Sequence, residues 1–158
     1  MESEFEQKKL YSLQDLCAIV AEGRITSMGI RAHLDKSLIP CEFKSRAQGA
    51  PTYFSPDNVL TIAIFYALTL TGMLLKPAAR IIKRLPPDTW RDVADGFTRY
   101  LVTPLSGEGG IQFLSDIEEL TQPKHPATVI IDLKAIRENV IRKVEETFEK
   151  RSKAKGTK

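Results

Sequence analysis

Basic side chains gather in one stretch of the sequence, between residues 24 and 46. The charged residues there are Arg24, Arg31, Lys36, Lys44 and Arg46, with Asp35 and Glu42 as the acids. Five positive charges against two negative charges give a local net charge of +3. Lysine and arginine are the side chains that neutralise phosphate groups. The stretch therefore indicates a patch that binds a polyanion.

The charge of the whole chain shows that this patch is local. The 158 residues carry 23 Lys and Arg against 20 Asp and Glu, a net charge of +3. Residues 150–158 hold five cations and no acid, so the remainder has 18 basic and 20 acidic side chains, a net charge of −2. A basic field over the whole surface is therefore excluded. We expect 150–158 to be a basic disordered tail and 1–10 a disordered lead-in.

The remaining reactive residue types do not combine into a catalytic or metal-binding pattern. The histidines are His33 and His125, and the cysteines are Cys17 and Cys41. The glycine-rich segment 106–110 lacks the Gly-Lys-Ser/Thr ending of a phosphate loop, and we interpret it as a flexible turn. We predict no enzyme, no metal site and no cofactor. Free thiols and an N-terminus without an apolar run are typical of a cytoplasmic protein.

One uncharged segment, from Asn58 to Leu75, is 18 residues long and so touches the length of a membrane span. It contains three threonines and Gly72, and Lys76 closes it at once. A helix buried in a small bundle explains this composition better than a membrane span. We therefore expect no membrane partner.

Helix caps and apolar spacing predict the elements that position the basic patch. Ser12 and Thr26 are suited to cap two helices, over 13–21 and 26–35. Leu38, Ile39 and Pro40 end the second helix, because the residue before a proline is pushed out of the helical region. Two helices joined by a short turn are expected.

A hairpin and two further helices should follow. Residues 42–44 and 52–54 are compatible with short strands around a loop that contains glycine. Ser55-Pro56-Asp57 is a favoured helix start, and this helix should run to Leu70. A fourth helix is expected over 77–85.

A second unit is predicted after Pro86-Pro87, over residues 88–149. Asp88 should cap a helix that continues through Leu101, followed by strands over 111–113 and 129–131. The aromatic residues of this unit either pack its core or line an effector pocket, and we favour the core. They are Trp90, Phe97, Tyr100 and Phe113.

The last helix should begin after Asp132 and carry an apolar stripe. The stripe consists of Leu133, Ile136, Val140, Val144 and Phe148. It could pair with its copy in a second subunit or fold back on its own domain. We favour pairing, which predicts a homodimer.

The first half of the chain resembles the DNA-binding domain of the MerR transcription regulators. Their opening Tyr-Ser/Thr-Ile-x-Glu/Asp-Leu is similar to residues 11–16, YSLQDL. Their recognition helix and the Gly-Leu-Leu-Pro after it align without a gap with 25–34 and 37–40. The close of their wing is similar to 53–59, with one extra residue, and Gly72 matches the glycine that ends their third helix. The resemblance implies a winged helix-turn-helix over 11–85.

The resemblance also implies that helix 26–35 enters the major groove and that the 42–54 hairpin, as a wing, contacts phosphates. The residues that we expect to contact DNA are Arg24, Thr26, Ser27, Met28, Arg31, His33, Lys44, Arg46 and Tyr53. The chain departs from the family where paired tyrosines and a glutamate are replaced by Ala32, His33 and Leu34. Met28 stands where the family has an arginine.

The sequence thus predicts a mainly α protein. A winged helix-turn-helix N-terminal domain precedes a small α+β C-terminal unit that ends in a long helix. The predicted function is transcription regulation through double-stranded DNA, with a small-molecule effector left open. Because the wing and the family's tyrosines are weakly represented, the alternative is a winged-helix adaptor that binds proteins and has lost its affinity for DNA.

Overall fold

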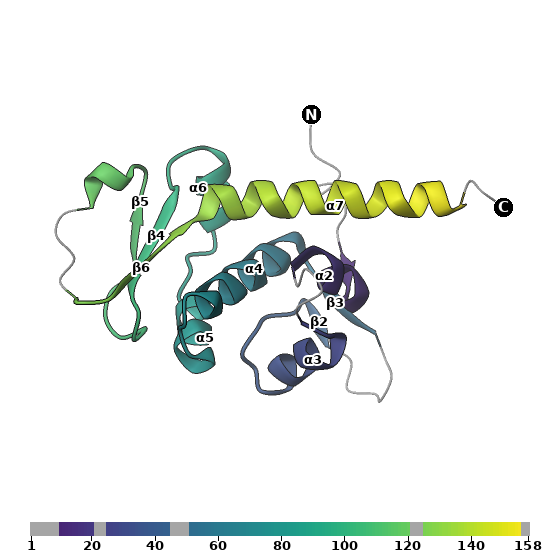
Figure 1. Ribbon diagram of the computed structural model, residues 1–158, viewed down its shortest axis with the longest axis horizontal. Coiled ribbons are helices and arrows are strands. Elements are labelled where there is room, and N and C mark those ends of the chain that lie inside the picture. The colour runs from purple at the N-terminus through teal and green to yellow at the C-terminus, as the bar shows by residue number, and fades with distance from the viewer. Residues whose placement is uncertain (1–9, 21–24, 45–50, 121–124, 156–158) are drawn as a thin grey trace. The chain divides into compact units, whose positions relative to one another are not determined.

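The computed structural model describes residues 10–20, 25–44, 51–120 and 125–155, and these residues are mainly helical (Figure 1). Their strands form two antiparallel sheets of three strands each. The expected mainly α class with a small amount of sheet is therefore confirmed. Contacts divide the chain into two compact units, and each is described by itself below. The first unit is Met1–Leu60 with Arg137–Lys158, and the second unit is Thr61–Ile136.

These units divide the chain at other places than the predicted domains, 11–85 and 88–149. Pro86-Pro87 lies inside the second unit, and the C-terminal part of α7 (Leu133–Lys155) belongs to the first. The C-terminal part of α7 is connected to the first unit through Arg151, which donates a hydrogen bond to Asp15. The end of the chain is thereby tied to its beginning.

The first unit begins with a short strand that the sequence did not predict. The elements are β1 (Tyr11–Ser12), α2 (Leu13–Val20), α3 (Ser27–Asp35), β2 (Phe43–Lys44), β3 (Thr52–Phe54) and the start of α4 (Pro56–Leu70). The strand order is β1-β3-β2, with Tyr11 opposite Phe54 and Phe43 opposite Tyr53. The predicted hairpin is confirmed, and β1 makes it a three-stranded sheet.

The predicted caps of the first two helices are confirmed. The amide of Asp15 donates to Ser12 Oγ at 3.1 Å, and the amide and hydroxyl of Ser12 donate back to the Asp15 carboxylate at 3.0 Å. Thr26 Oγ1 accepts from the amide of Gly29 at 3.1 Å. Such caps satisfy amides that have no partner inside the helix. Ser37, with φ 54°, lies in the left-handed region just past the end of α3.

Large apolar side chains from β1, α2, α3, β3, α4 and α7 form the core of the first unit. The fully buried ones include Tyr11, Leu16, Ile30, Phe54, Val59 and Val144. Tyr11 and Phe54 face each other across the sheet, and Leu16 and Ile30 come from the paired helices α2 and α3. Burial of Tyr11 and the nearby negative charge of Asp15 raise the pKa of its hydroxyl well above its usual value. Helices α2 and α3 therefore pack against each other, and α2 also packs against β1 and β3.

The second unit combines helices with the other sheet. It contains the rest of α4, α5 (Leu75–Lys83), α6 (Thr89–Ala94), β4 (Tyr100–Pro104), β5 (Gln112–Leu114), the 3-10 helix η1 (Ile117–Glu119), β6 (Thr128–Asp132) and the start of α7. The strand order is β5-β4-β6. Asp132 Oδ1 accepts from the amide of Ala135, so Asp132 caps α7 as predicted. The predicted helix 77–85 is displaced by two residues, and the strands 111–113 and 129–131 are close to β5 and β6.

The helix predicted from Asp88 through Leu101 is wrong in its second half. It ends at Ala94, and Gly96 with φ 81° turns the chain away. Phe97 is consequently 73% exposed, whereas Leu101 lies fully buried in β4. The apolar spacing predicts a single helical face through Leu101. Gly96 ends the helix instead, and Leu101 pairs with Ile131 in the sheet. Asp88 makes no side-chain capping bond and pairs with Arg91 at 2.9 Å.

The glycine-rich segment 106–110 is not simply a flexible turn. Gly107 is buried with φ 67°, and a Cβ on it would lie 2.7 Å from Cβ of Pro77. Arg84 donates to the carbonyl of Gly109 at 3.2 Å. The close approach to α5 therefore requires glycine at position 107.

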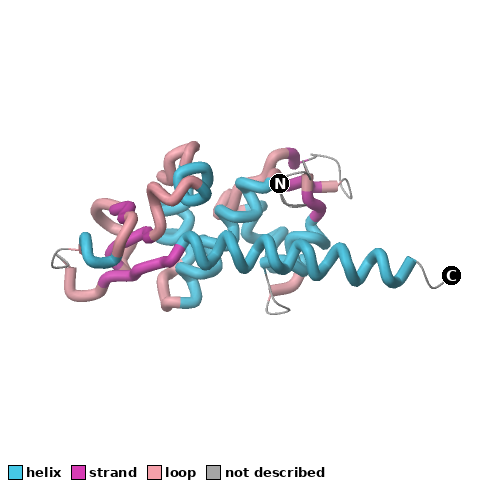
Figure 2. Tube along the Cα trace, turned by 90° about the horizontal axis from the view of Figure 1, so that it is seen from above, coloured by secondary structure: helices cyan, strands magenta, loops and turns pink. Residues whose placement is uncertain are grey.

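Two expectations for the C-terminal helix are also corrected. Residues 150–155 are helical, so the predicted disordered tail 150–158 is wrong for this part, and Figure 2 shows α7 as one uninterrupted helix. Leu133, Val140 and Val144 are buried within the chain itself, and Ile136 and Phe148 are half-buried. Side chains already covered by their own chain cannot cover a second copy. Leu133, Val140 and Val144 are thus part of the core, which agrees with the alternative that the stripe folds back on its own chain, and the homodimer stays a prediction.

The uncharged segment 58–75 forms most of α4, which has 15 residues. Its continuation is a turn at Thr71 and Gly72, where Gly72 has φ 94°. Among the described residues, no helix is sufficiently long and apolar to cross a bilayer.

Removal of Arg151 tests the tie between the two ends of the first unit. Arg151→Met removes the guanidinium that is paired with the buried Asp15 carboxylate, and we expect the free energy of unfolding to fall by about 1–3 kcal/mol. Lys153→Met is the matched control, because Lys153 is 81% exposed and lies 3.8 Å from Glu149. It should change stability by less than about 0.5 kcal/mol in urea unfolding followed by circular dichroism. Equal losses in the two variants would contradict this assignment.

The corrected end of α6 can be tested by two truncations. Leu101→Ala empties a fully buried position of β4 and should cost about 2–5 kcal/mol of unfolding free energy. Phe97→Ala removes a side chain that is 73% exposed and should cost less than about 0.5 kcal/mol. If α6 continued through Leu101, both truncations would be similarly costly. Chemical denaturation of both variants distinguishes the two structures.

Candidate nucleic-acid interface

Helix α3 has one buried face and one exposed face. Ile30 and Leu34 are buried, which fixes the helix against the rest of the first unit. The opposite face is open to solvent and contains Thr26, Ser27, Met28, Arg31, Ala32 and Asp35. Four of the residues predicted to contact DNA, namely Thr26 to Met28 and Arg31, therefore lie together on one accessible surface. We call these six residues the α3 outer face.

The N-terminal end of α3 is suited to an approaching anion. The first turn contains no acidic residue, and its first amides lie at the positive end of the helix dipole. The residues at this end are small apart from Met28. Gly29 packs inward, since a Cβ there would lie 3.2 Å from Ile25 Cγ2. Glycine at position 29 thus allows α3 to pack closely on Ile25, while Thr26 and Ser27 remain exposed.

The cations predicted for this surface are only partly described. Arg31 is exposed on the α3 outer face. Lys44 lies on β2, the strand that would begin the wing. Arg24 and Arg46 lie outside the described residues. The described part of the α3 outer face therefore offers one arginine beside one acid, Asp35.

Tyr53 and His33 are less accessible than the other predicted contacts. Tyr53 is half-buried in the central strand β3, where its carbonyl accepts from the amide of Glu42 at 3.0 Å. His33 is half-buried near the end of α3. Burial, and then the positive charge of Lys36, lower the pKa of the His33 imidazole. Both effects favour the neutral form of the His33 imidazole over the charged form.

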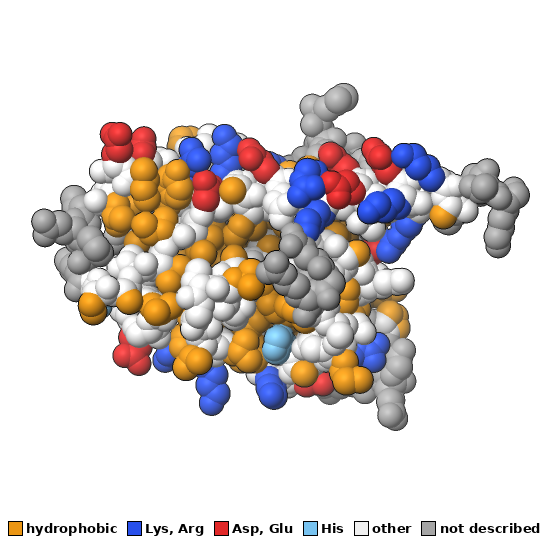
Figure 3. Space-filling view, in the orientation of Figure 1, with side chains coloured by type: hydrophobic (Ala, Val, Ile, Leu, Met, Phe, Trp, Pro, Cys, Tyr) orange, Lys and Arg blue, Asp and Glu red, His pale blue; other side chains and the backbone are white. Residues whose placement is uncertain are grey.

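The other accessible charged surface of the first unit is α7. Along this helix, acidic and basic side chains alternate, as Figure 3 shows. Several are paired within the helix, such as Arg142 with Glu146 at 2.5 Å and Lys153 with Glu149 at 3.8 Å. A mixed surface of this kind keeps a helix soluble and makes a weak anion site.

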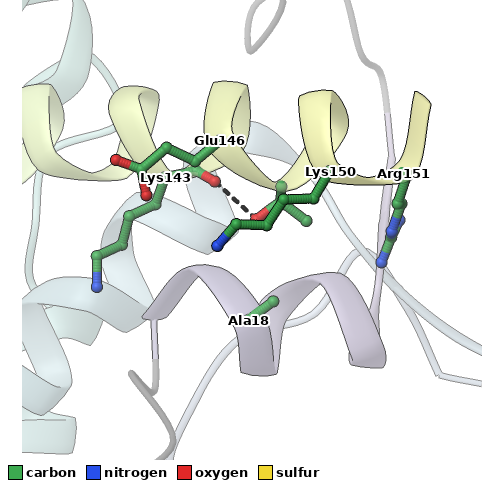
Figure 4. A pocket seen from close by; sticks show the side chains of 6 residues that line it. Ala18, Lys143, Glu146, Lys150 and Arg151 are labelled. Atoms are coloured by element: carbon green, nitrogen blue, oxygen red, sulfur yellow. Dashed lines mark hydrogen bonds between the residues drawn. The ribbon is translucent and has the colours of Figure 1, made fainter. Parts of the chain in front are cut away.

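A shallow groove of about 330 Å³ lies between α2 and α7 (Figure 4). Its walls are Ala18 from α2 and Lys143, Glu146, Thr147, Lys150 and Arg151 from α7. Arg151 is paired with Asp15, and Glu146 with Arg142. The groove has no aromatic side chain, which small organic ligands usually need. We therefore assign no effector to it.

The aromatic residues considered for an effector pocket do not share one environment. Trp90 is buried, and its indole donates to Thr61 Oγ1 at 3.4 Å. Phe97 is 73% exposed, whereas Tyr100 and Phe113 are half-buried on neighbouring strands. Trp90 thus packs in the core, as the sequence analysis expects of these aromatic residues, whereas Phe97 does not.

The metal-ligating side chains and the two cysteines of the described residues were also compared with the prediction. No group of three or more His, Cys, Asp or Glu side chains is placed there to hold an ion. Cys17 and Cys41 are half-buried and form no disulfide, as expected, and burial raises the pKa of the Cys17 thiol.

No protein-family model matches the chain, and no curated protein matches it significantly.

Sequence reasoning missed the buried position of Asp15 and its partner. Asp15 is 4% exposed, and Arg151 reaches it across 136 positions of sequence. The spacing Ser12-x-x-Asp15 is a capping signal that could have indicated the local half of this arrangement. No local sequence signal connects Asp15 to Arg151, and the sequence predicts that Arg151 lies in a disordered tail.

The pKa of His33 provides a test of the surroundings of α3. In Lys36→Gln a like charge is removed, so the pKa should rise, while burial still holds it below the ordinary value. A lowered pKa in the folded state means that stability is present above the ordinary value of about 6.5 and is lost as the pH falls through the folded pKa. The variant should therefore lose less stability on acidification.

Imidazole NMR titration of both proteins measures this shift, with Lys76→Gln on α5 as the control. An unchanged titration of His33 in Lys36→Gln would show that Lys36 does not act on it.

Proposed function

We propose that this protein binds double-stranded DNA through a winged helix-turn-helix formed by its first unit, and that it regulates transcription. The observation that carries the proposal is the α3 outer face. A helix is anchored by Ile30 and Leu34, while its N-terminal half is open, small and free of acids. A major groove admits one helix presented in this way.

The neighbouring elements support the same function. Helix α2 precedes α3, and the β2–β3 hairpin follows it, which is the order of helix, helix and wing. This hairpin would approach the phosphates as a wing, with Lys44 on β2. β1 on the far side of β3 would brace the hairpin. In this arrangement Arg31 supplies a base or phosphate contact, and Thr26 and Ser27 approach the backbone.

The resemblance to the MerR regulators adds a second line of support. It rests on the residues from Tyr11 to Gly72, most of which lie in the first unit. Two of the departures from the family, Met28 and Ala32, fall on the α3 outer face. The proposal therefore assigns DNA binding to this chain with a recognition surface of its own.

Charge reversal on α3 tests the proposal. The whole chain is used to select duplexes from a randomised pool, and binding to the enriched duplex is measured by fluorescence anisotropy over a salt series. Arg31→Glu should weaken binding about tenfold or more and reduce the salt slope by about 1. Arg80→Glu is the control, because Arg80 is also an exposed helical arginine and the change in net charge is the same.

Two results would refute the proposal. If micromolar protein at low salt enriches no duplex, the first unit does not bind DNA, and the adaptor alternative gains support. If Arg31→Glu and Arg80→Glu weaken binding equally, net charge and not the α3 outer face determines the affinity.

A further inference from the structure

Met28 is the most exposed large hydrophobic side chain among the described residues, at 79%. It lies in the first turn of α3, where the resemblance to the MerR regulators has an arginine. An exposed methionine of this size contributes nothing to the core of the first unit. Its position at the accessible end of a helix leaves it open to contact with a partner.

The neighbours of Met28 define a small recognition surface. Arg31 and Ala32 follow it by three and four residues, so all three lie on one side of the helix. Ile30 and Leu34 occupy the buried side. A methionine, a methyl group and a guanidinium are thus presented side by side.

This set of groups matches a particular chemistry of the major groove. Thymine is the base that offers a methyl group there, and apolar side chains contact it. Arginine pairs with the O6 and N7 acceptors of guanine. A long, unbranched methionine can adapt its shape to a flat methyl-bearing edge.

We infer that Met28, supported by Ala32, reads a thymine methyl group next to the base contacted by Arg31. This inference rests on the proposed function and specifies its target: a duplex with thymine and guanine at adjacent or nearby positions. A protein partner fits this surface less well. Ser27, Arg31 and Asp35 surround Met28, so no broad apolar patch exists on this face.

Removal of the thymine methyl group from the DNA tests the inference directly. The duplex enriched by the whole chain is resynthesised with deoxyuridine replacing one thymine at a time, which preserves base pairing. At one or two positions the wild-type affinity should fall about fourfold, the value of one buried methyl group. Met28→Ala should bind the thymine duplex about fourfold more weakly and be indifferent to deoxyuridine at that position.

Two controls separate this role from general effects. Leu74→Ala removes an equally exposed apolar side chain, 74% exposed, from the second unit and should leave binding unchanged. The salt slope should stay the same in Met28→Ala, because no charge is lost. Circular dichroism confirms that both variants are folded.

The outcomes distinguish this inference from the proposed function. If a duplex is enriched but deoxyuridine has no effect at any position, or if Met28→Ala retains the full deoxyuridine penalty, the role of Met28 is overturned while DNA binding stands. If no duplex is enriched at all, the proposed function fails and the inference fails with it.

Discussion

The first unit depends on a carboxylate that is hidden from water. Asp15 is 4% exposed and accepts hydrogen bonds from the amide and hydroxyl of Ser12 and from Arg151. A buried charge is tolerated only when it is paired and hydrogen-bonded. The same group therefore starts α2, helps to keep the hydroxyl of Tyr11 protonated and holds the last turns of α7 in the unit. One side chain thus couples the beginning and the end of the chain.

Because the core of the first unit holds the buried face of α3, the α3 outer face is exposed to solvent. Ile30 and Leu34 are held among buried apolar groups, so the outward direction of Met28 and Arg31 follows from the fold. Specific recognition requires such pre-positioned side chains, because ordering them at the moment of binding would cost affinity. Among the described residues of this face the cation is Arg31, so in the proposed complex with DNA we expect shape and methyl contacts to contribute beside electrostatic attraction.

The C-terminal helix illustrates how a sequence pattern can be read in two ways. The stripe that includes Val140 and Val144 has the spacing of a dimer seam, and the same spacing suits a helix packed on its own chain. In the structure both residues are buried without a second copy. Burial of these two residues therefore agrees with a helix packed on its own chain.

The sequence by itself determined much of the local structure. In the first unit these features are the caps at Ser12 and Thr26, the two helices and the hairpin strands, and in the second unit the glycine just past the end of α4. Caps, turns and periodicity act over three or four residues and are legible without tertiary contacts. Only the tertiary structure decided that β1 completes the sheet, that Gly96 and β4 interrupt the helix expected through Leu101, and that Arg151 finds Asp15. These depend on pairing between residues distant in sequence, whose free energy no local pattern records.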